Sequence, residues 1–269
     1  MEIKDFFYKY YTPQSTLEVL RNLTVKWSSP LEFNDPFDSQ LYLTSGDDSY
    51  FESVRDLTIK ELESVGSNLS ETEKAAINRL VELEKKNIKD IPRKWREYAR
   101  NARIFCVSET QDDLLMWAHY SDSHKGAVIK FRNIVDGKIG FKDAKVVRYS
   151  TQIPKIAYGP YDILNNLGKE GIRDFDMFFF EVLFTKSNHW SYEKEWRIVQ
   201  FLDKQDEKLH DFRPILPEEI DGVYLGCRIK ESIKEEILSL VPGKLKHIKV
   251  FESNKNADRF ALDFIEKKI

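Results

Sequence analysis

The sequence predicts an α+β protein with a mixed or antiparallel sheet core and a helical insertion. Short apolar and aromatic runs bounded by turn-forming residues recur along the 269-residue chain and indicate strands. Amphipathic runs with apolar residues at helical spacing stand between several of them. One stretch, at about residues 49–103, is helical in pattern throughout. No internal repeat or Pro-rich linker divides the chain, so we expect a single domain over residues 1–269.

The chain should begin with a strand, a helix and a second strand. Residues 6–11 form an aromatic run, and Thr12 followed by Pro13 is a typical N-cap and first-turn pair. The helix that follows would bury Leu17, Leu20 and Leu23. Residues 24–28 alternate as a strand, and residues 40–44 could form another.

The helical insertion carries two predicted helix starts. Ser49 with Glu52, and Ser70 with Glu73, both have the spacing of a capping box, in which each side chain binds the other residue's backbone amide.

The remaining elements alternate between strands and helices. We expect strands at 104–108, 126–131, 145–149, 222–225 and near 248–251 and 260–265, and helices at 114–120 and 174–186. Ser232 and Glu235 predict a further capping box that opens a helix ending before Pro242 and Gly243.

The composition favours a folded cytoplasmic protein that does not enter a membrane. The chain is 41% hydrophobic and 32% charged, and its net charge of −3 gives no general attraction to nucleic acid or anionic lipid. The two cysteines, Cys106 and Cys227, stand far apart in apolar surroundings, as reduced thiols do. Residues 1–5 are charged where a secretory signal would be apolar, and no apolar run is long enough to span a membrane.

The strongest candidate for chemistry is the block at residues 189–198, His-Trp-Ser-Tyr-Glu-Lys-Glu-Trp-Arg-Ile. If this block is an extended strand, Glu193, Glu195 and Arg197 share one face. Two carboxylates side by side repel each other unless a cation compensates, which is typical of a site that holds or polarises a substrate. A solvated edge strand with a surface ion pair is the alternative interpretation.

Two other segments carry polar residues that chemistry could use. His119, inside Met-Trp-Ala-His-Tyr at 116–120, is either a general base or a helix histidine bonded to a backbone or carboxylate partner. Asp35 and Asp38, inside Asn-Asp-Pro-Phe-Asp at 34–38, could bind a metal ion together with Glu193 or Glu195, but Asn and Asp before Pro also stabilise turns. No phosphate-binding glycine loop, His-Glu-x-x-His pair or Cys-x-x-Cys pair is present.

Together these blocks resemble a bacterial and phage family that is known only as a domain of unknown function. The resemblance is carried by Tyr-Lys-Tyr near the N-terminus, Trp-Ser-Ser-Pro-x-x-Phe-Asn-Asp-Pro-Phe-Asp at 27–38, Phe-Cys-Val-Ser-Glu and Met-Trp-Ala-His-Tyr within 105–120, and Trp-Ser-Tyr-Glu-Lys-Glu-Trp-Arg at 190–197. It covers nearly the whole chain.

More distantly, the order of elements is similar to that of ADP-ribosyltransferases. This resemblance implies a sheet core of that type, NAD as a substrate and a macromolecular acceptor, either protein or nucleic acid, in phage defence or toxin biology. It would place Glu195 on the ribose of NAD and Glu193 beside the acceptor, in chemistry where a fixed carboxylate stabilises an oxocarbenium-like state. The catalytic candidates are then Glu193, Glu195 and Arg197, and the candidates for holding NAD are Lys9, Tyr10, Ser28, Ser29, Asn34, Trp117, His119 and Tyr120. Lys9 departs from the pattern, because transferases usually carry Arg or His there.

Two other functions remain open at the level of sequence. A metal-dependent nuclease could use Asp35, Asp38, His119 and Glu195 and bind phosphates through the basic segment 93–103 around Trp95, although a solvated helix face would have the same pattern. A non-enzymatic recognition or sensor module could instead use the same residues as a buried polar network.

Overall fold

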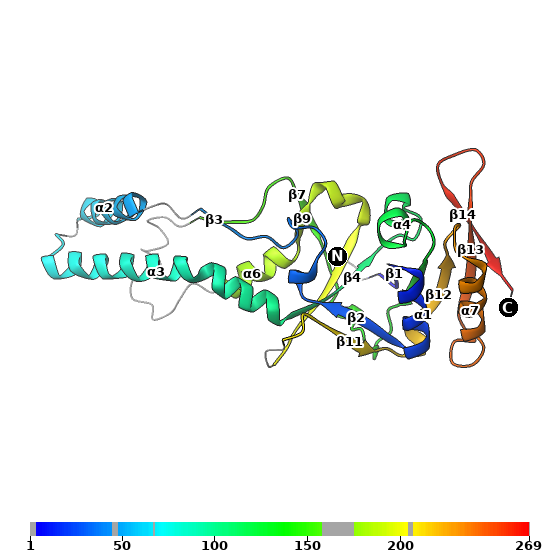
Figure 1. Cartoon of the computed structure of the whole chain (residues 1–269). Coiled ribbons are helices and arrows are strands. Elements are labelled where there is room, and N and C mark those ends of the chain that lie inside the picture. Colours follow the sequence, from blue (N-terminus) through cyan, green and yellow to red (C-terminus); the bar gives the residue numbers. More distant parts are fainter. Residues whose placement is uncertain (1–3, 45–47, 67, 158–174, 204–206, 269) are drawn as a thin grey trace.

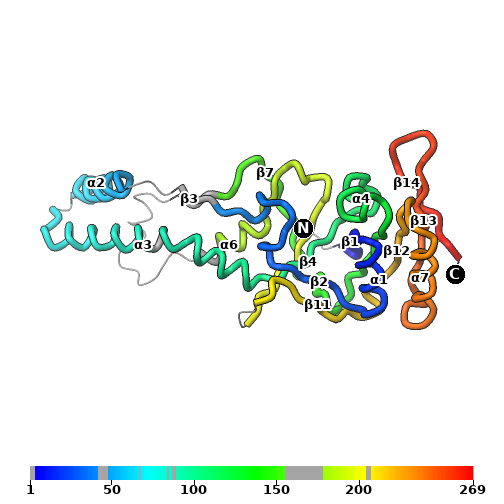
Figure 2. Tube along the Cα trace, viewed as in Figure 1, coloured from blue at the N-terminus to red at the C-terminus, as the bar shows by residue number. Residues whose placement is uncertain are grey.

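A computed structural model describes residues 4–44, 48–66, 68–157, 175–203 and 207–268 of the chain. It is a mixed α+β structure in which a large, mostly antiparallel sheet forms the body and a pair of helices extends from it as an arm (Figure 1). Figure 2 traces the same path and shows the C-terminal elements at the end of the body opposite the arm. The α+β class that the sequence predicts is therefore confirmed.

The large sheet has the strand order β11-β2-β4-β1-β5-β12-β13-β14, and β10 pairs with both β4 and β6. Its neighbours run antiparallel except for the parallel pair of β12 and β13. The strands are β1 Phe6–Tyr11, β2 Thr24–Ser28, β4 Ala102–Ser108, β5 Ala127–Arg132, β6 Lys145–Val146, β10 Glu195–Phe201, β11 His210–Pro214, β12 Ile220–Leu225, β13 Lys249–Lys255 and β14 Leu262–Lys267. Two small parallel pairs join β3 Tyr42–Thr44 to β8 Lys155–Ala157, and β7 Arg148–Ser150 to β9 Thr185–Ser187.

The helices are α1 Pro13–Asn22, α2 Asp48–Ser64, α3 Glu71–Asn101, α4 Leu114–Tyr120, α6 Phe175–Leu183 and α7 Glu231–Leu240, with short 3₁₀ turns η1 Pro30–Glu32, η2 Phe141–Asp143, η3 Asn188–Glu193 and η4 Pro217–Glu219. No helix among the described residues combines the length and the apolar character that crossing a membrane requires.

Alternating side chains of the strands form two cores, one on each face of the sheet. Phe7 and Tyr11 of β1 belong to the main core, which also contains Phe105 and apolar residues of α1 and α7. Tyr10 belongs instead to a smaller core on the other face, where α4 contributes Trp117. This alternation has the period of two that strands require, so one face of the sheet is left available beside α4.

Strand β4 stands at a fork in the sheet. One of its edges pairs with β10 over all seven residues. On the other edge it meets β1 only at Ser108, opposite Tyr8, and β2 only at Ile104, opposite Ser28. The strands β1 and β2 therefore diverge on either side of Cys106, and the gap between them opens the surface on which the candidate site lies.

The predicted helical insertion is the arm formed by α2 and α3. Ser70 caps α3 in the predicted capping box, since its Oγ accepts from the amide of Glu73 and the Glu73 carboxylate accepts from the amide of Ser70. The hydroxyl of Ser29 donates to the carbonyl of Ala99 at 2.7 Å and ties the base of the arm to the end of β2.

Three expectations about local structure are wrong. Ser49 lies inside the first turn of α2, which already begins at Asp48. Ser232 lies inside α7, whose N-cap is Lys230 without a side-chain bond, so neither serine opens its helix. Residues 184–186 do not continue α6, because the chain leaves the helix after Leu183 and enters β9, and Asp174 is outside the described residues.

Candidate functional site

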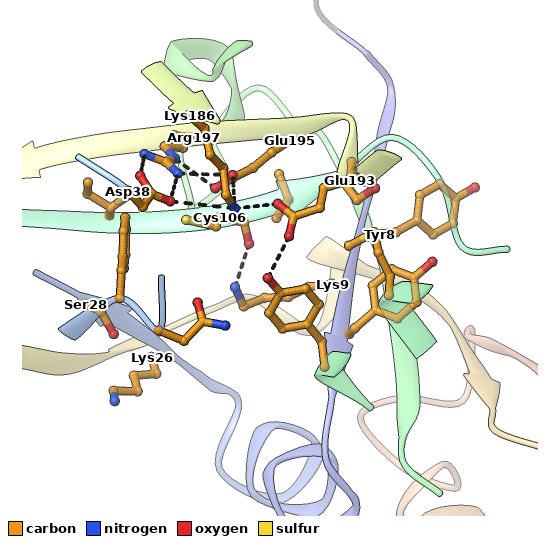
Figure 3. Close-up of a pocket in the computed structure, with 18 of the residues that line it drawn as sticks. Tyr8, Lys9, Lys26, Ser28, Asp38, Cys106, Lys186, Glu193, Glu195 and Arg197 are labelled. Atoms are coloured by element: carbon orange, nitrogen blue, oxygen red, sulfur yellow. Dashed lines mark hydrogen bonds and ion pairs between the residues drawn. The ribbon is translucent and has the colours of Figure 1, made fainter. Parts of the chain in front are cut away.

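A cavity of about 280 Å³ lies over the fork between β1, β2 and β4, with α4 on one side (Figure 3). The structure brings together at its lining most of the residues that the sequence singled out, namely Lys9, Tyr10, Ser28, Asn34, Tyr120, Glu193, Glu195 and Arg197. Tyr8, Lys26, Asp38, Cys106 and Lys186 line it as well.

The two glutamates reach the cavity from different elements. Glu193 ends η3, Glu195 begins β10, and Lys194 between them has a left-handed backbone with φ of 46°. The expectation of one extended strand from 193 to 197 is therefore wrong at Glu193. Both acids still face the same side, because the left-handed residue turns the chain, and both are buried at 3% and 5% exposure rather than solvated.

The ammonium of Lys186 joins the two acids. Its Nζ lies 2.5 Å from Glu193 Oε2, 3.0 Å from Glu195 Oε2 and 3.6 Å from Asp38 Oδ2. This cation, which comes from β9, compensates the repulsion that two adjacent buried carboxylates would otherwise suffer. Its ammonium also lies 5.2 Å from the centre of the Trp190 ring, within the range of a cation–π contact.

Arg197 is fully buried and holds Glu195 and Asp38 at the same time. Its Nε and Nη2 donate to the two oxygens of Glu195 at 2.8 and 3.1 Å. Its Nη1 and Nη2 donate to the two oxygens of Asp38 at 3.0 and 2.6 Å, and Nη1 also donates to the carbonyl of Leu183. These bonds engage all five N–H donors of the guanidinium, so Arg197 positions the two carboxylates.

The pKa values of the two glutamates are displaced in opposite directions. Burial acts to raise the pKa of Glu195, but the charges of Arg197 and Lys186 outweigh it and hold the pKa well below its usual value of 4.5. Burial raises the pKa of Glu193, and the single nearby cation, Lys186, does not offset burial together with the repulsion from Glu195. Glu195 is therefore held as a carboxylate, whereas the surroundings of Glu193 favour its protonated form.

Two neighbouring groups are held in their protonated forms. The hydroxyl of Tyr120 donates to Glu193 Oε1 at 2.6 Å, and burial together with that carboxylate raises the pKa of Tyr120. Burial and the charge of Glu195 raise the pKa of the Cys106 thiol. Cys106 is therefore a neutral part of the cavity wall, because a thiol must ionise to act as a nucleophile.

Lys9 crosses the fork from β1 to β4. Its Nζ donates to the carbonyl of Cys106 at 2.5 Å, on the edge that has no strand partner at that residue (Figure 3). The ammonium also lies 4.6 Å from the centre of the Phe105 ring. Burial lowers the pKa of Lys9, with partial compensation from Glu195 and Glu193. The Lys9 side chain therefore links β1 to β4 at the edge of the cavity.

Three of the residues proposed to hold NAD do not line the cavity. Ser29 is fully buried, and its hydroxyl caps η1 and donates to Ala99. Trp117 is also fully buried and donates from Nε1 to the carbonyl of Gln111. His119 is on the exposed side of α4, 6.2 Å from the ring of Trp190. Their positions give them structural or surface roles next to the cavity.

The residues of the nuclease hypothesis lie in two places. Asp38 and Glu195 belong to the buried cluster around Arg197. Asp35 instead accepts from Trp190 Nε1 at 2.6 Å, and His119 lies against the same ring. Over the part of the chain that is described, no three His, Cys, Asp or Glu side chains are arranged to hold a metal ion.

The basic segment 93–103 covers the end of α3 and the first two residues of β4, and it has partners within the chain. Trp95 packs edge-on against Phe179 of α6, with ring centres 5.4 Å apart. Arg93 forms ion pairs with Asp90 and Glu97 on the same helix.

Sequence reasoning missed Lys186 and Tyr149. Lys186 lies at the end of an apolar helical pattern, and its strand is defined only by pairing with β7, which no local signal indicates. The hydroxyl of Tyr149 accepts from the amide of Glu195 at 2.8 Å. The acid pair itself could have predicted a further cation, because two buried carboxylates require more positive charge than Arg197 alone supplies.

Comparison with known proteins supports part of the resemblance noted from the sequence, over residues 116–198. No curated protein and no solved structure matches the chain. Residues 116–198, from α4 to β10, match the model of a family described as "Protein of unknown function (DUF2971)". This segment contains Tyr120, Lys186, Glu193, Glu195 and Arg197 and leaves out Lys9 and Asp38. Over these residues the chain is similar to a domain-of-unknown-function family, and the segment it shares with that family carries both acids of the candidate site.

Proposed function

We propose that the cavity binds NAD and that the protein transfers ADP-ribose to a macromolecular acceptor. The observation that carries this proposal is the acid pair. Glu193 and Glu195 line one cavity, and their pKa values are shifted in opposite directions. Two carboxylates whose environments separate their pKa values can divide the roles of charge stabiliser and proton acceptor.

In the proposed reaction, the bond between the ribose C1′ and the nicotinamide nitrogen breaks and its electrons leave with nicotinamide. Positive charge then develops on the ribose, and the ionised Glu195 stabilises it. A nucleophile of the acceptor attacks C1′, and Glu193 takes the proton that the nucleophile releases.

The remaining lining supports a nucleotide ligand. Lys9 and Lys26 are the lining cations that could contact a pyrophosphate, and Lys26 would exchange its ion pair with Glu32, at 3.2 Å, for that contact. The rings of Tyr8 and Tyr120 offer aromatic surface for nicotinamide. A volume of about 280 Å³ is just below the range of roughly 300–1,000 Å³ for small-molecule sites, so we expect only the nicotinamide riboside half to be enclosed.

The test compares nicotinamide release from NAD by the wild type and by Glu195→Gln. Loss of a charge that stabilises the transition state typically lowers such a rate by about 10²- to 10³-fold. Glu193→Gln should lower transfer to an acceptor more than it lowers hydrolysis of NAD by water, because an attacking water molecule can pass its proton to the surrounding solvent. Glu252→Gln is the matched control, since this acid is also paired with lysines but lies on β13.

Circular dichroism and thermal melting establish that each variant is folded. Equal nicotinamide release by the wild type and Glu195→Gln, or no release by either, would contradict the proposal. NAD binding by the wild type without release would instead favour a recognition or sensor module, for which the fully bonded Arg197 cluster is the supporting observation.

A further inference from the structure

A second cavity, of about 480 Å³, lies on the other side of α4, between this helix and the β13–β14 hairpin. Leu114 of α4 lines it, whereas Met116 and Tyr120 of the same helix line the first cavity. The hairpin projects beyond the sheet at the C-terminal end of the body (Figures 1 and 2). The proposed NAD chemistry makes no use of this surface.

The lining of the second cavity is rich in positive charge. Arg228, Lys255 and Arg259 contribute three exposed cations to the lining, which contains one acid, Asp258. Within the described residues, neither Lys255 nor Arg259 forms an ion pair. This excess contrasts with the overall charge of −3, so the hairpin face is an electropositive patch on an acidic protein.

The tip of the hairpin also presents an aromatic ring. Phe260 is fully exposed and stands between Arg259 and the start of β14. An exposed phenylalanine costs solvation free energy unless a partner covers it, and a ring with cations beside it suits a stacked base with its phosphates.

The loop that carries these residues is held in one conformation. The side-chain oxygen of Asn256 accepts from the amides of Asp258 and Arg259 at 2.9 and 3.0 Å. Its Nδ2 donates to Asp263 on β14 at 3.0 and 3.1 Å. The ring and the cation are thus presented on an ordered loop, which lowers the entropy lost on binding.

The floor of the cavity contains an unsatisfied polar group. The ring of His124 stacks on Trp117 with centres 5.9 Å apart, and its buried Nδ1 has no hydrogen-bond partner among the described residues. Burial and the charge of Arg228 lower the pKa of His124, so its ring is neutral and can donate or accept.

From the patch and the exposed ring, we propose that this cavity and hairpin bind single-stranded nucleic acid. Phe260 stacks on a base, and Arg228, Lys255 and Arg259 contact the phosphates. A duplex is a poorer fit, because its bases are already stacked on each other and their faces are not available to Phe260.

The experiment measures fluorescence anisotropy of a labelled oligouridine with the full chain, in the absence of NAD. Phe260→Ala should weaken binding by about 5- to 100-fold, as loss of one base–ring stack does. The double variant Lys255→Gln with Arg259→Gln should reduce the slope of log affinity against log salt by about 1.4, because two phosphate contacts are lost. All three positions are exposed, so the variants should fold normally.

Two exposed residues elsewhere provide matched controls. Phe212→Ala removes an exposed ring on β11, and Lys142→Gln removes an exposed cation in η2, and both should bind like the wild type. The proposal is overturned by absence of binding at about 100 µM protein, or by equal affinities of Phe260→Ala and the wild type. If polyglutamate displaced the labelled oligouridine as well as unlabelled oligouridine does, the proposal would also be overturned, because the patch would then attract any polyanion.

Discussion

The ammonium of Lys186 lies between the carboxylates of Glu193 and Glu195, 2.5 Å from the first and 3.0 Å from the second. In the protein without a ligand, this lysine compensates the negative charge of the two acids, as a cationic substrate or transition state would during a reaction. It also makes the acid pair dependent on a residue of another strand, β9. The stability of the site and its response to pH should follow from this single contact.

Lys186→Met should destabilise the fold by about 3 to 5 kcal/mol at neutral pH, because it leaves buried carboxylates without their cation. Urea unfolding measures the effect. The deficit should shrink at acidic pH, where Glu193 takes up a proton and one of the uncompensated charges disappears. The control Lys234→Met breaks an ion pair with the more exposed Glu252 and should cost about 1 kcal/mol or less. Equal losses in both variants would refute the central role of Lys186.

Arg197→Lys keeps the charge but removes the planar fork that binds Asp38 and Glu195 at once. A lysine ammonium has three donors and cannot satisfy both carboxylates with the carbonyl of Leu183. We expect a loss of about 3 kcal/mol in the free energy of unfolding. Urea unfolding at ~25 °C measures this loss, with Arg213→Lys as the control at a more exposed arginine. A loss below ~1 kcal/mol would contradict the role of the planar guanidinium in binding both carboxylates.

The two glutamates should change stability with pH in opposite senses. The folded-state pKa of Glu193 is raised above 4.5. Between 4.5 and this raised pKa, the folded protein still binds a proton that the unfolded chain has released, so the contribution of Glu193 to the free energy of unfolding falls as pH rises. The pKa of Glu195 is lowered, so its contribution is present above 4.5 and falls as pH decreases below it.

Unfolding free energies measured across this pH range separate the two acids. Relative to Glu193→Gln, the wild type should lose up to about 1.4 kcal/mol per pH unit as pH rises above 4.5. Relative to Glu195→Gln, it should instead lose stability as pH falls below 4.5. Parallel pH profiles for the two variants would be inconsistent with the opposite environments of the acids.

Tyr120→Phe removes the hydroxyl that donates to Glu193. This bond favours the ionised carboxylate, so its loss should raise the pKa of Glu193 further. If NAD is cleaved as proposed, the acidic limb of the rate–pH profile for transfer should move to higher pH. Tyr192→Phe is the control, because no hydrogen bond of its hydroxyl reaches either acid within the described structure, and its profile should stay unchanged.

Ser70→Ala should loosen the start of α3 without affecting the cavity. Loss of an N-cap side chain costs about 1 kcal/mol, which corresponds to roughly fivefold faster amide hydrogen exchange in the first turn. Ser53→Ala in α2 is the control, since that hydroxyl bonds only to the carbonyl of Ser49 inside its own helix. Unchanged exchange in Ser70→Ala would argue against the capping box.

Sequence patterns predicted the elements that have local signals. The strand 6–11, the helix after Thr12 and the strand 24–28 were predicted correctly, because the Thr-Pro pair fixes the helix start and apolar spacing fixes the rest. The helix 114–120 also matches α4. The strand β11 was missed, since its residues His210–Pro214 do not alternate in the manner of a half-buried strand.

The candidate site was predicted in composition but not in geometry. Two carboxylates in one short block indicated charge that needs compensation, whatever the backbone. The left-handed backbone of Lys194 could not be predicted from the sequence, because glycine or asparagine usually occupies such positions. Lys186 and the fork at β4 depend on pairing between distant strands, which no local pattern records.

Asp38 and Arg197 are bonded across 159 positions of the chain. During synthesis the N-terminal strands and the entire helical arm emerge before Arg197 does, so Asp38 spends that time without its counter-ion. Contacts between such distant positions also form late in refolding, because a long loop must close first. A ribosome stalled before β10 would therefore carry a nascent chain without ligand affinity, because Arg197 and five strands of the large sheet, β10 to β14, would still be missing.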